Sequence, residues 1–359
     1  MDPSDLRRQF PVLADAAYLN AGTDGPLAAD AVRAADAELA HQLRAGRTAE
    51  HFKRTAELRA QLRERYASLL HCAPEELSLS TCTTEGIAQV VGGLGLAAGE
   101  EILTSDEEHP GLQGALVAAK ELRGVTVREV PLARIAQEIG PATRLVACSH
   151  VGWMSGTHAP AELAEVDVPV LFDGAQGAGA VPVDVGALGC DAYAAAGQKW
   201  LCGPDGTGML YLSARLRERV AVDRRGYANM ENPGDGLGAR LHADSRRLDA
   251  LGLNGQTLAL AVSAFDILAR AGWNEIHDRA ADLAERLVGM LQAAGRAVAP
   301  RGRGTLVAFA SADPAGERER LAAAGVMLRD IPGRPWLRAS VGAWNDDADL
   351  ERLIGALDA

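Results

Sequence analysis

The sequence predicts an α/β protein, with a mostly parallel sheet sandwiched by helices and a smaller C-terminal α+β domain. Between about residues 70 and 212, short apolar runs rich in strand-forming residues alternate with helical patterns. Near-continuous apolar strands that alternate with helices are typical of a parallel sheet covered on both faces. The chain of 359 residues is also long enough to bury a large core and to form about two domains.

Strand-like runs predict a sheet of the seven-stranded type in the large domain, to which we assign residues 15–254. A helical pattern at residues 30–46 precedes them. Residues 213–250 are irregular and rich in Arg, Gly and Asn, so no element is predicted there. In chain order the runs are residues 76–81, 101–106, 125–132, 143–150, 169–176, 190–197 and 206–212.

The predicted smaller domain combines residues 1–14 with residues 255–359. Its C-terminal part predicts two helices, then a strand, a helix, a strand and a final helix, an order typical of an α+β unit. The corresponding stretches are residues 258–272, 274–295, 305–310, 316–325, 336–342 and 347–357.

Charge and cysteine content exclude several classes of function. The net charge of −12 argues against nucleic-acid and anionic-membrane partners, because both need a basic face. The N-terminal "MDPSDLRRQF" has no apolar segment typical of a signal peptide, and no apolar run is long enough to span a bilayer. The five cysteines include no CxxC pair, which disfavours a disulfide framework and a zinc site. We therefore expect a cytoplasmic protein without a metal.

Lys199 stands out because the chain hardly uses lysine. Lys53 and Lys120 are the only others among 36 basic residues, and both lie in helical, solvent-facing patterns. Lys199 instead follows an apolar strand, as does Asp173, so both are expected in one crevice at the strand ends. Such a pair suits a pyridine cofactor, with Asp173 keeping the ring nitrogen protonated and Lys199 condensing with an aldehyde. An arginine cannot condense in this way. The alternative for Lys199 alone is a strand-end surface cation.

Further polar residues follow neighbouring strands. Thr83 and Thr84 end one strand and open a helix, where free N–H groups and hydroxyls can bind a phosphate. An ordinary helix cap explains the same residues, and the two roles are compatible. His109 also falls just after a strand. A lone histidine is more often structural or on the surface, but at this position an imidazole can stack on a planar cofactor.

Motifs along the whole chain resemble those of one enzyme family. They include "AYLNAGTDGPL", "TTEG", "DEEHPGL", "SHVGWMSGT" and the long block "DGAQGAGAVPVDVGALGCDAYAAAGQKWLCGPDGTGMLY". In this order they resemble class V aminotransferase-like enzymes, which depend on pyridoxal 5'-phosphate and have fold type I. "NAGTDGPL" and "DEEHPGL" are similar to the cysteine/cystine C–S lyase-like branch, which neighbours cysteine desulfurases and isopenicillin-epimerase-like proteins.

The resemblance implies a role for each matching residue. It makes Lys199 the catalytic lysine that holds the cofactor, with Asp173 on the pyridine nitrogen and His109 on the ring. Gln176 would donate to the phenolic oxygen, and Arg338 would bind the substrate carboxylate. Thr83, Thr84 and Gln198 would hold the phosphate, and Arg334 would be a second substrate contact. The resemblance also implies a homodimer.

Two departures from the desulfurases shape the predicted reaction. No cysteine follows Cys202, so the nucleophilic cysteine of their C-terminal domain is missing. Trp153 replaces their asparagine and suggests a different substrate pocket. We therefore predict a C–S β-lyase that converts cysteine, cystine or a cysteine S-conjugate into pyruvate, ammonia and a thiol or persulfide. An aminotransferase or an amino-acid epimerase is the alternative, and the missing cysteine disfavours a desulfurase.

Overall fold

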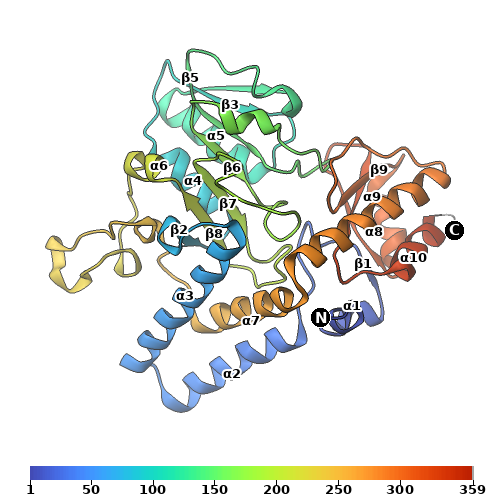
Figure 1. Cartoon of the computed structure of the whole chain (residues 1–359), viewed down its shortest axis with the longest axis horizontal. Helices are drawn as coiled ribbons and strands as arrows, with labels where there is room; N and C mark the ends of the chain where they lie inside the picture. The colour runs from blue at the N-terminus through green and yellow to red at the C-terminus, as the bar shows by residue number, and fades with distance from the viewer. Residues whose placement is uncertain (358–359) are drawn as a thin grey trace.

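The computed structural model describes residues 1–357 and is built around a seven-stranded sheet (Figure 1). Its strands are β2 (Leu77–Ser80), β3 (Glu101–Ser105), β4 (Thr126–Val130), β5 (Thr143–Ser149), β6 (Val170–Asp173), β7 (Ala192–Ala196) and β8 (Gly208–Leu212). They lie in the order β2-β8-β7-β6-β5-β3-β4. β8 runs antiparallel to both of its neighbours, β2 and β7, and all other neighbouring strands of this sheet pair in parallel. The predicted mostly parallel α/β sheet is therefore confirmed.

Helices cover both faces of this sheet because the strands are apolar on both sides. Leu171 of β6 belongs to the core that packs against one set of helices, whereas the next residue, Phe172, belongs to the core on the opposite face. This alternation explains why the strands are continuously apolar. The first face carries α4 (Thr83–Gly93), α5 (Pro110–Arg123) and α6 (Ala214–Arg219), and the second carries α3 (Ala49–Leu70) and α7 (Gly255–Ala271).

Small residues bring α4 close to the sheet. A Cβ atom added to Gly86 of α4 would lie 3.1 Å from the Cβ of Ala194 in β7, which is tighter than an ordinary contact. Glycine on the helix and alanine on the strand therefore permit this close packing. This packing places the N-terminus of α4 beside the end of β7.

A second, smaller sheet is formed by β9 (Leu306–Ala310), β11 (Arg329–Asp330) and β12 (Trp336–Ser340), all antiparallel. It shares a core with α8 (Trp273–Ala293), α9 (Pro314–Ala323) and α10 (Asp347–Leu357). β1 (Ala17–Tyr18) and β10 (Val326–Met327) pair in parallel nearby. The predicted α+β character of this region is confirmed. The proposed domain boundary at residue 254 stays a prediction.

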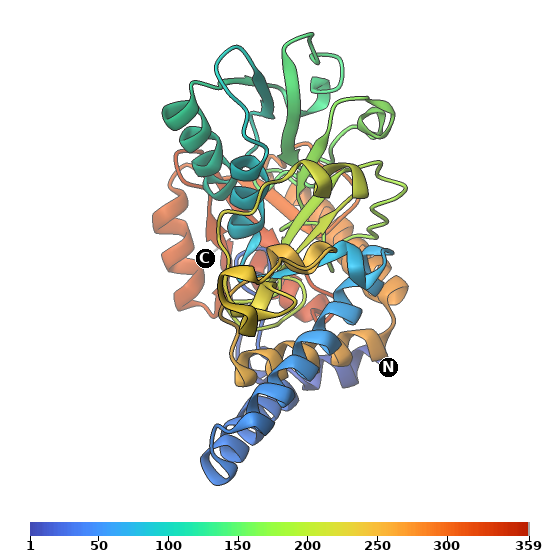
Figure 2. The same ribbon diagram turned by 90° about the vertical axis from the view of Figure 1, so that its left-hand side faces the viewer.

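The N-terminal region ends in a long helical arm. After α1 (Pro3–Arg8), α2 (Ala29–Ala45) lies beside α7 and leads into α3 (Figures 1 and 2). Residues 220–250 form only short 3-10 helices, and the middle of this segment protrudes (Figure 1, yellow), whereas its end, η7 (Ser245–Leu248), packs against β2. Apolar side chains are exposed on the arm and on this segment, among them Leu43, Phe52 and Leu237. A homodimer contact would cover such side chains; it stays a prediction that sedimentation velocity can test.

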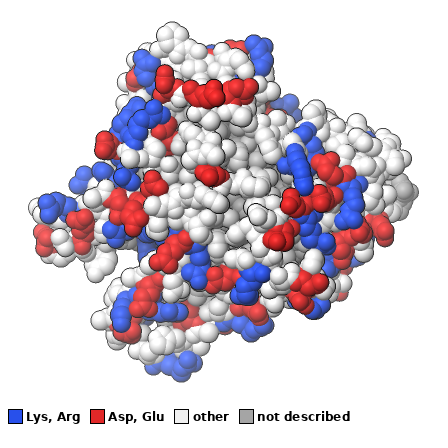
Figure 3. Space-filling model, viewed as in Figure 1, with Lys and Arg blue, Asp and Glu red and all other residues white. Residues whose placement is uncertain are grey.

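The surface of the described residues has neither a membrane-spanning helix nor, on the face drawn in Figure 3, a basic patch. Within residues 1–357, no helix is long and apolar enough to cross a membrane. On the face drawn in Figure 3, lysines and arginines are interspersed with acidic residues. This face therefore has no continuous basic stripe of the kind that nucleic-acid binding uses.

Candidate active site

Asp173 and Lys199 come together where β6 and β7 end. Asp173 is the last residue of β6, and its buried carboxylate accepts a hydrogen bond from the Ala175 amide at 2.9 Å. Burial raises the pKa of Asp173, and the positive charge of Lys199 opposes that shift. Burial also lowers the pKa of the Lys199 amine to about 8, with Asp173 acting in the opposite direction. The amine is therefore partly neutral close to physiological pH, as a nucleophile or base requires.

A cavity of about 220 Å³ opens beside this pair. It brings together every predicted site residue except Arg338 and Arg334. The lining residues are Gly22, Thr23, Cys82, Thr83, Thr84, His109, Trp153, Asp173, Ala175, Gln176, Ala196, Gln198, Lys199 and Arg329.

The N-terminus of α4 presents unused polar atoms to the cavity. Cys82 caps this helix, because its Sγ accepts a hydrogen bond from the Glu85 amide at 3.4 Å. Neither threonine is therefore needed as the cap. The Thr83 hydroxyl is buried and has no hydrogen-bond partner in the described chain, so it can donate to an anion. The Gln198 Oε1 is also buried without a partner, but it is an acceptor, so only the amide nitrogen of Gln198 could donate to a phosphate. Unpaired donors at a helix N-terminus favour an anion.

His109 and Trp153 form an aromatic wall. The His109 Nδ1 accepts a hydrogen bond from the Gly111 amide at 3.0 Å, so a neutral ring carries its proton on Nε2. Burial, with a smaller contribution from the positive charge of Lys199, lowers the pKa of His109 to about 4. The ring is therefore neutral near pH 7 and contacts Trp153 edge-on, with centroids 5.1 Å apart.

Gln176 is held in one orientation by two contacts. Its Oε1 accepts from the Trp200 Nε1 at 3.0 Å, and its Nε2 donates to the Gly22 carbonyl at 2.8 Å. An amide nitrogen carries two hydrogens, so one remains to donate into the cavity.

Of the two arginines predicted to bind the substrate, Arg338 is buried near the cavity, whereas Arg334 lies away from it. Arg338 is fully buried, and one of its Nη atoms donates to the carbonyl of Trp153. Its Nε and Nη2 have no partner in the described chain, which leaves them free for a carboxylate. Arg334 instead lies exposed in the turn between β11 and β12 and does not line the cavity. Arg329 also lines the cavity, and no local motif in the sequence indicates it.

These groups fit pyridoxal phosphate. Unpartnered polar atoms at the α4 N-terminus suit its phosphate, and the neutral His109 ring suits its planar face. Asp173 and Lys199 suit its ring nitrogen and its aldehyde. Fold and donor set together define a pyridoxal-phosphate enzyme of fold type I.

Comparison with known proteins identifies the family. The family model "Aminotransferase class-V" matches residues 18–353, and the chain belongs to this family. It is 33% identical to isopenicillin N epimerase from Amycolatopsis lactamdurans, over 82% of this chain and 83% of the epimerase. It is 31% identical to a probable cysteine desulfurase from Pseudomonas aeruginosa, over 82% of this chain and 81% of that protein.

Solved structures of related enzymes have the same fold as this chain. The cystine C–S lyase C-DES in complex with its product cysteine persulfide matches with a TM-score of 0.92 and 27% identity, covering 97% of this chain and 99% of C-DES. A C-DES variant with glycine linked to its PLP cofactor matches with a TM-score of 0.91 and 27% identity, covering 98% of each chain. The protein is therefore a class V enzyme that depends on pyridoxal phosphate.

The lowered pKa of Lys199 predicts how the apoprotein captures its cofactor. Only the neutral amine condenses, so the capture rate should rise roughly tenfold from pH 7 to pH 9 and then level off, given a pKa of about 8. Stopped-flow absorbance measures this rate, with Nα-acetyl-lysine as a reference amine that corrects for ionisation of the cofactor itself. A protein rate that follows the reference amine at every pH contradicts the prediction, because an exposed lysine keeps gaining neutral amine above pH 9.

Proposed function

We propose that the enzyme is a C–S β-lyase that acts on cysteine, cystine or another cysteine S-conjugate. One observation carries the proposal: Lys199 is the only amine among the residues that line the described cavity, and His109 has a pKa of about 4. β-Elimination needs a single base, which takes the α-proton and returns it to the departing sulfur. The missing desulfurase cysteine also supports elimination. The cavity cysteine, Cys82, caps α4, and Cys202 is buried with a raised thiol pKa.

The chain's residues are proposed to hold the cofactor as follows. When bound, pyridoxal phosphate supplies an aldehyde that condenses with amines and a ring that takes up the negative charge left on the α-carbon. Asp173 keeps the proton on the ring nitrogen, and Gln176 donates to the phenolic oxygen. His109 packs on the ring. The phosphate is held by Thr83, Thr84 and Gln198.

The substrate is proposed to lie between the two sheets. Arg338 binds its α-carboxylate through the free Nε and Nη2, while the buried indole of Trp153 excludes water from one side. The Lys199 Nζ removes the α-proton. The C–S bond then breaks with its electron pair going to sulfur, and the same proton converts the leaving group into a thiol, or into a persulfide when the substrate is cystine. Hydrolysis of the released enamine consumes one water and yields pyruvate and ammonia.

An epimerase is the second candidate because of the similarity to isopenicillin N epimerase. Epimerisation and transamination use the same lysine and the same aspartate, but they leave the β-substituent in place. The fate of sulfur therefore separates the candidates.

We expect the holoenzyme to release equimolar pyruvate, ammonia and thiol or persulfide from S-conjugates of L-cysteine. A panel of cysteine, cystine and a thioether should be assayed for all three products, the sulfur products being hydrogen sulfide, cysteine persulfide and a thiol. A cysteine sulfoxide should give pyruvate, ammonia and a sulfenic acid instead. The recovered amino acid should be checked by chiral chromatography. L-2-Aminobutyrate, which has no leaving group, is the matched control and should release no pyruvate. Recovery of only an epimerised amino acid or a keto acid that retains sulfur would exclude the lyase.

A further inference from the structure

Glu108 is a buried carboxylate beside the candidate active site that the proposed reaction does not use. It directly precedes His109 and is only 3% exposed. Its Oε1 accepts a hydrogen bond from the Ser149 amide at 2.9 Å, and its Oε2 accepts one from the Ser149 hydroxyl at 2.7 Å. The Ser105 hydroxyl also donates to Oε1. The side chain thereby connects the end of β3 to the end of β5.

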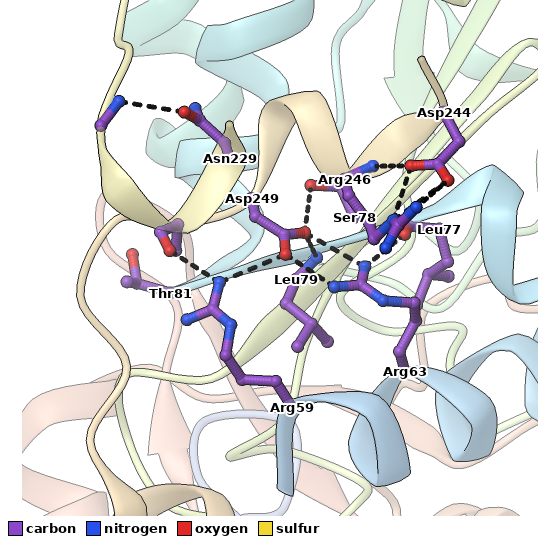
Figure 4. Close-up of polar contacts among 12 residues, drawn as sticks. Arg59, Arg63, Leu77, Ser78, Leu79, Thr81, Asn229, Asp244, Arg246 and Asp249 are labelled. Carbon is purple, nitrogen blue, oxygen red and sulfur yellow. Dashed lines mark hydrogen bonds and ion pairs between the residues drawn. The ribbon is translucent and has the colours of Figure 1, made fainter. Parts of the chain in front are cut away.

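Most buried carboxylates of the described chain are paired with an arginine. Figure 4 shows the pattern at Asp249, whose carboxylate binds both Nη atoms of Arg63, at 3.1 and 2.6 Å, and Arg59 at 3.2 Å. Such pairing offsets the cost of burying a charge. Within residues 1–357, eight aspartates and glutamates are buried, and the six that pair with an arginine are Glu38, Glu101, Asp191, Asp249, Glu317 and Asp349.

Asp173 and Glu108 are the two exceptions among these buried residues. Neither forms an ion pair within residues 1–357. Both lie at neighbouring strand ends, because Asp173 of β6 pairs in register with Ser149, the residue that donates to Glu108. For Asp173, the proposed cation is the protonated ring nitrogen of pyridoxal phosphate. A second unpaired carboxylate beside it indicates that Glu108 serves the same ring cation.

The surroundings of Glu108 favour its neutral form until a cation arrives. Two titratable groups face it, the Asp173 carboxylate on β6 and the Cys148 thiol on β5. Burial raises the pKa of the thiol and keeps it neutral. Burial, opposed by the serine hydrogen bonds and aided by the negative charge of Asp173, raises the pKa of Glu108 to about 7. A cation at Asp173 cancels the contribution of that negative charge, so Glu108 then ionises more readily.

We propose that Glu108 is a positioning residue for the cofactor, acting through Asp173, and that it gives up its proton when the ring cation of pyridoxal phosphate binds. The proton leaves the carboxyl oxygen for solvent, so one positive charge at the site replaces another. The carboxylate that remains adds a second negative charge behind Asp173, and two negative charges hold the ring-nitrogen proton more firmly than one. The inference rests on the proposed role of Asp173 but is independent of the reaction that the enzyme catalyses.

Proton release on cofactor binding tests the proposal without requiring turnover. Calorimetric titration of the apoprotein with pyridoxal phosphate, in two buffers that differ in ionisation enthalpy, counts the protons released. At pH 6.5 the wild-type protein should release about half a proton more than Glu108→Gln. At pH 8.5 the two proteins should release equal numbers, because Glu108 is then ionised in the apoprotein as well. Protons from Lys199 and from the cofactor are common to both proteins and cancel in the difference.

The Glu108→Gln variant can keep the hydrogen bonds of the glutamate. The new amide oxygen accepts from the Ser149 amide and the Ser105 hydroxyl, and the amide nitrogen donates to the Ser149 hydroxyl. Glu107→Gln is the matched control, because it removes a neighbouring carboxylate that instead accepts from the Ser155 hydroxyl. This control should release as many protons as the wild-type protein at both pH values.

Two results would overturn the proposal. One is equal proton release by the wild-type protein and Glu108→Gln at pH 6.5. The other needs no variant to fold: infrared spectra of the wild-type apoprotein that show no protonated carboxyl group above pH 6, because Glu108 would then be ionised before the cofactor binds. Nitrogen-15 NMR of the bound ring checks the role of Asp173 separately, since it reports whether the ring nitrogen is protonated. A missing pyruvate signal, which would exclude the lyase, leaves the proton count measurable.

Discussion

Lys199→Ala is expected to abolish the visible absorbance of the lysine-bound cofactor and to lower turnover on the order of 10³-fold or more. Alanine removes the amine that we propose both to condense with the cofactor and to move the α-proton. The remaining contacts to phosphate and ring stay in place, so the variant should still bind the cofactor reversibly. Absorbance spectra and pyruvate release measure the two effects.

Lys199→Arg is the matched control for this variant. It keeps a positive charge beside Asp173 but cannot condense with an aldehyde. The account predicts that arginine fails as completely as alanine. A Lys199→Arg enzyme with substantial activity would mean that the position needs only a charge.

Arg338→Gln is expected to lower kcat/KM for an L-amino-acid substrate by roughly 30- to 1,000-fold, equivalent to about 2–4 kcal/mol. The guanidinium is fully buried, and its two unpartnered nitrogens are the proposed contacts to the α-carboxylate. Glutamine keeps a donor but loses the planar charged fork that fixes the substrate. Steady-state kinetics with the best S-conjugate measure the effect.

Stability of the apoprotein separates this effect from misfolding. Because Arg338 is buried and no carboxylate within residues 1–357 pairs with it, its removal should leave the thermal midpoint unchanged or raise it. Arg334→Gln should change neither kinetics nor stability, since that side chain is exposed. A drop in the thermal midpoint that parallels the loss of activity would show that Arg338 supports the fold instead.

The parallel sheet and the strand-end residues were predictable because their signals are local. Apolar runs mark the strands, and the carboxyl ends of parallel strands meet at one edge, so Asp173 and Lys199 could be paired without a structure. The close packing of α4 onto β7 was not predicted, since it depends on Gly86 lying over Ala194 across two elements.

The positions of Arg334 and Arg329 could not be predicted from local sequence patterns. Arg334 is four residues from Arg338 and would share its face in a continuous strand. The strand begins only at Trp336, however, so Arg334 falls in a turn. Arg329 reaches the site through its register opposite Arg338, which is fixed by the folded hairpin. The irregular segment 220–250 is similarly held by long-range contacts such as those of Asp249 with Arg59 and Arg63.

The central claim is that Lys199 carries the cofactor, and the rarity of lysine makes it directly measurable. The holoenzyme should be reduced with borohydride, digested and mapped by mass spectrometry. Lys53 and Lys120 serve as internal controls, because both are exposed. We expect to find the reduced cofactor on the peptide containing Lys199 alone. Cofactor attached to Lys53 or Lys120 with Lys199 unmodified would contradict it.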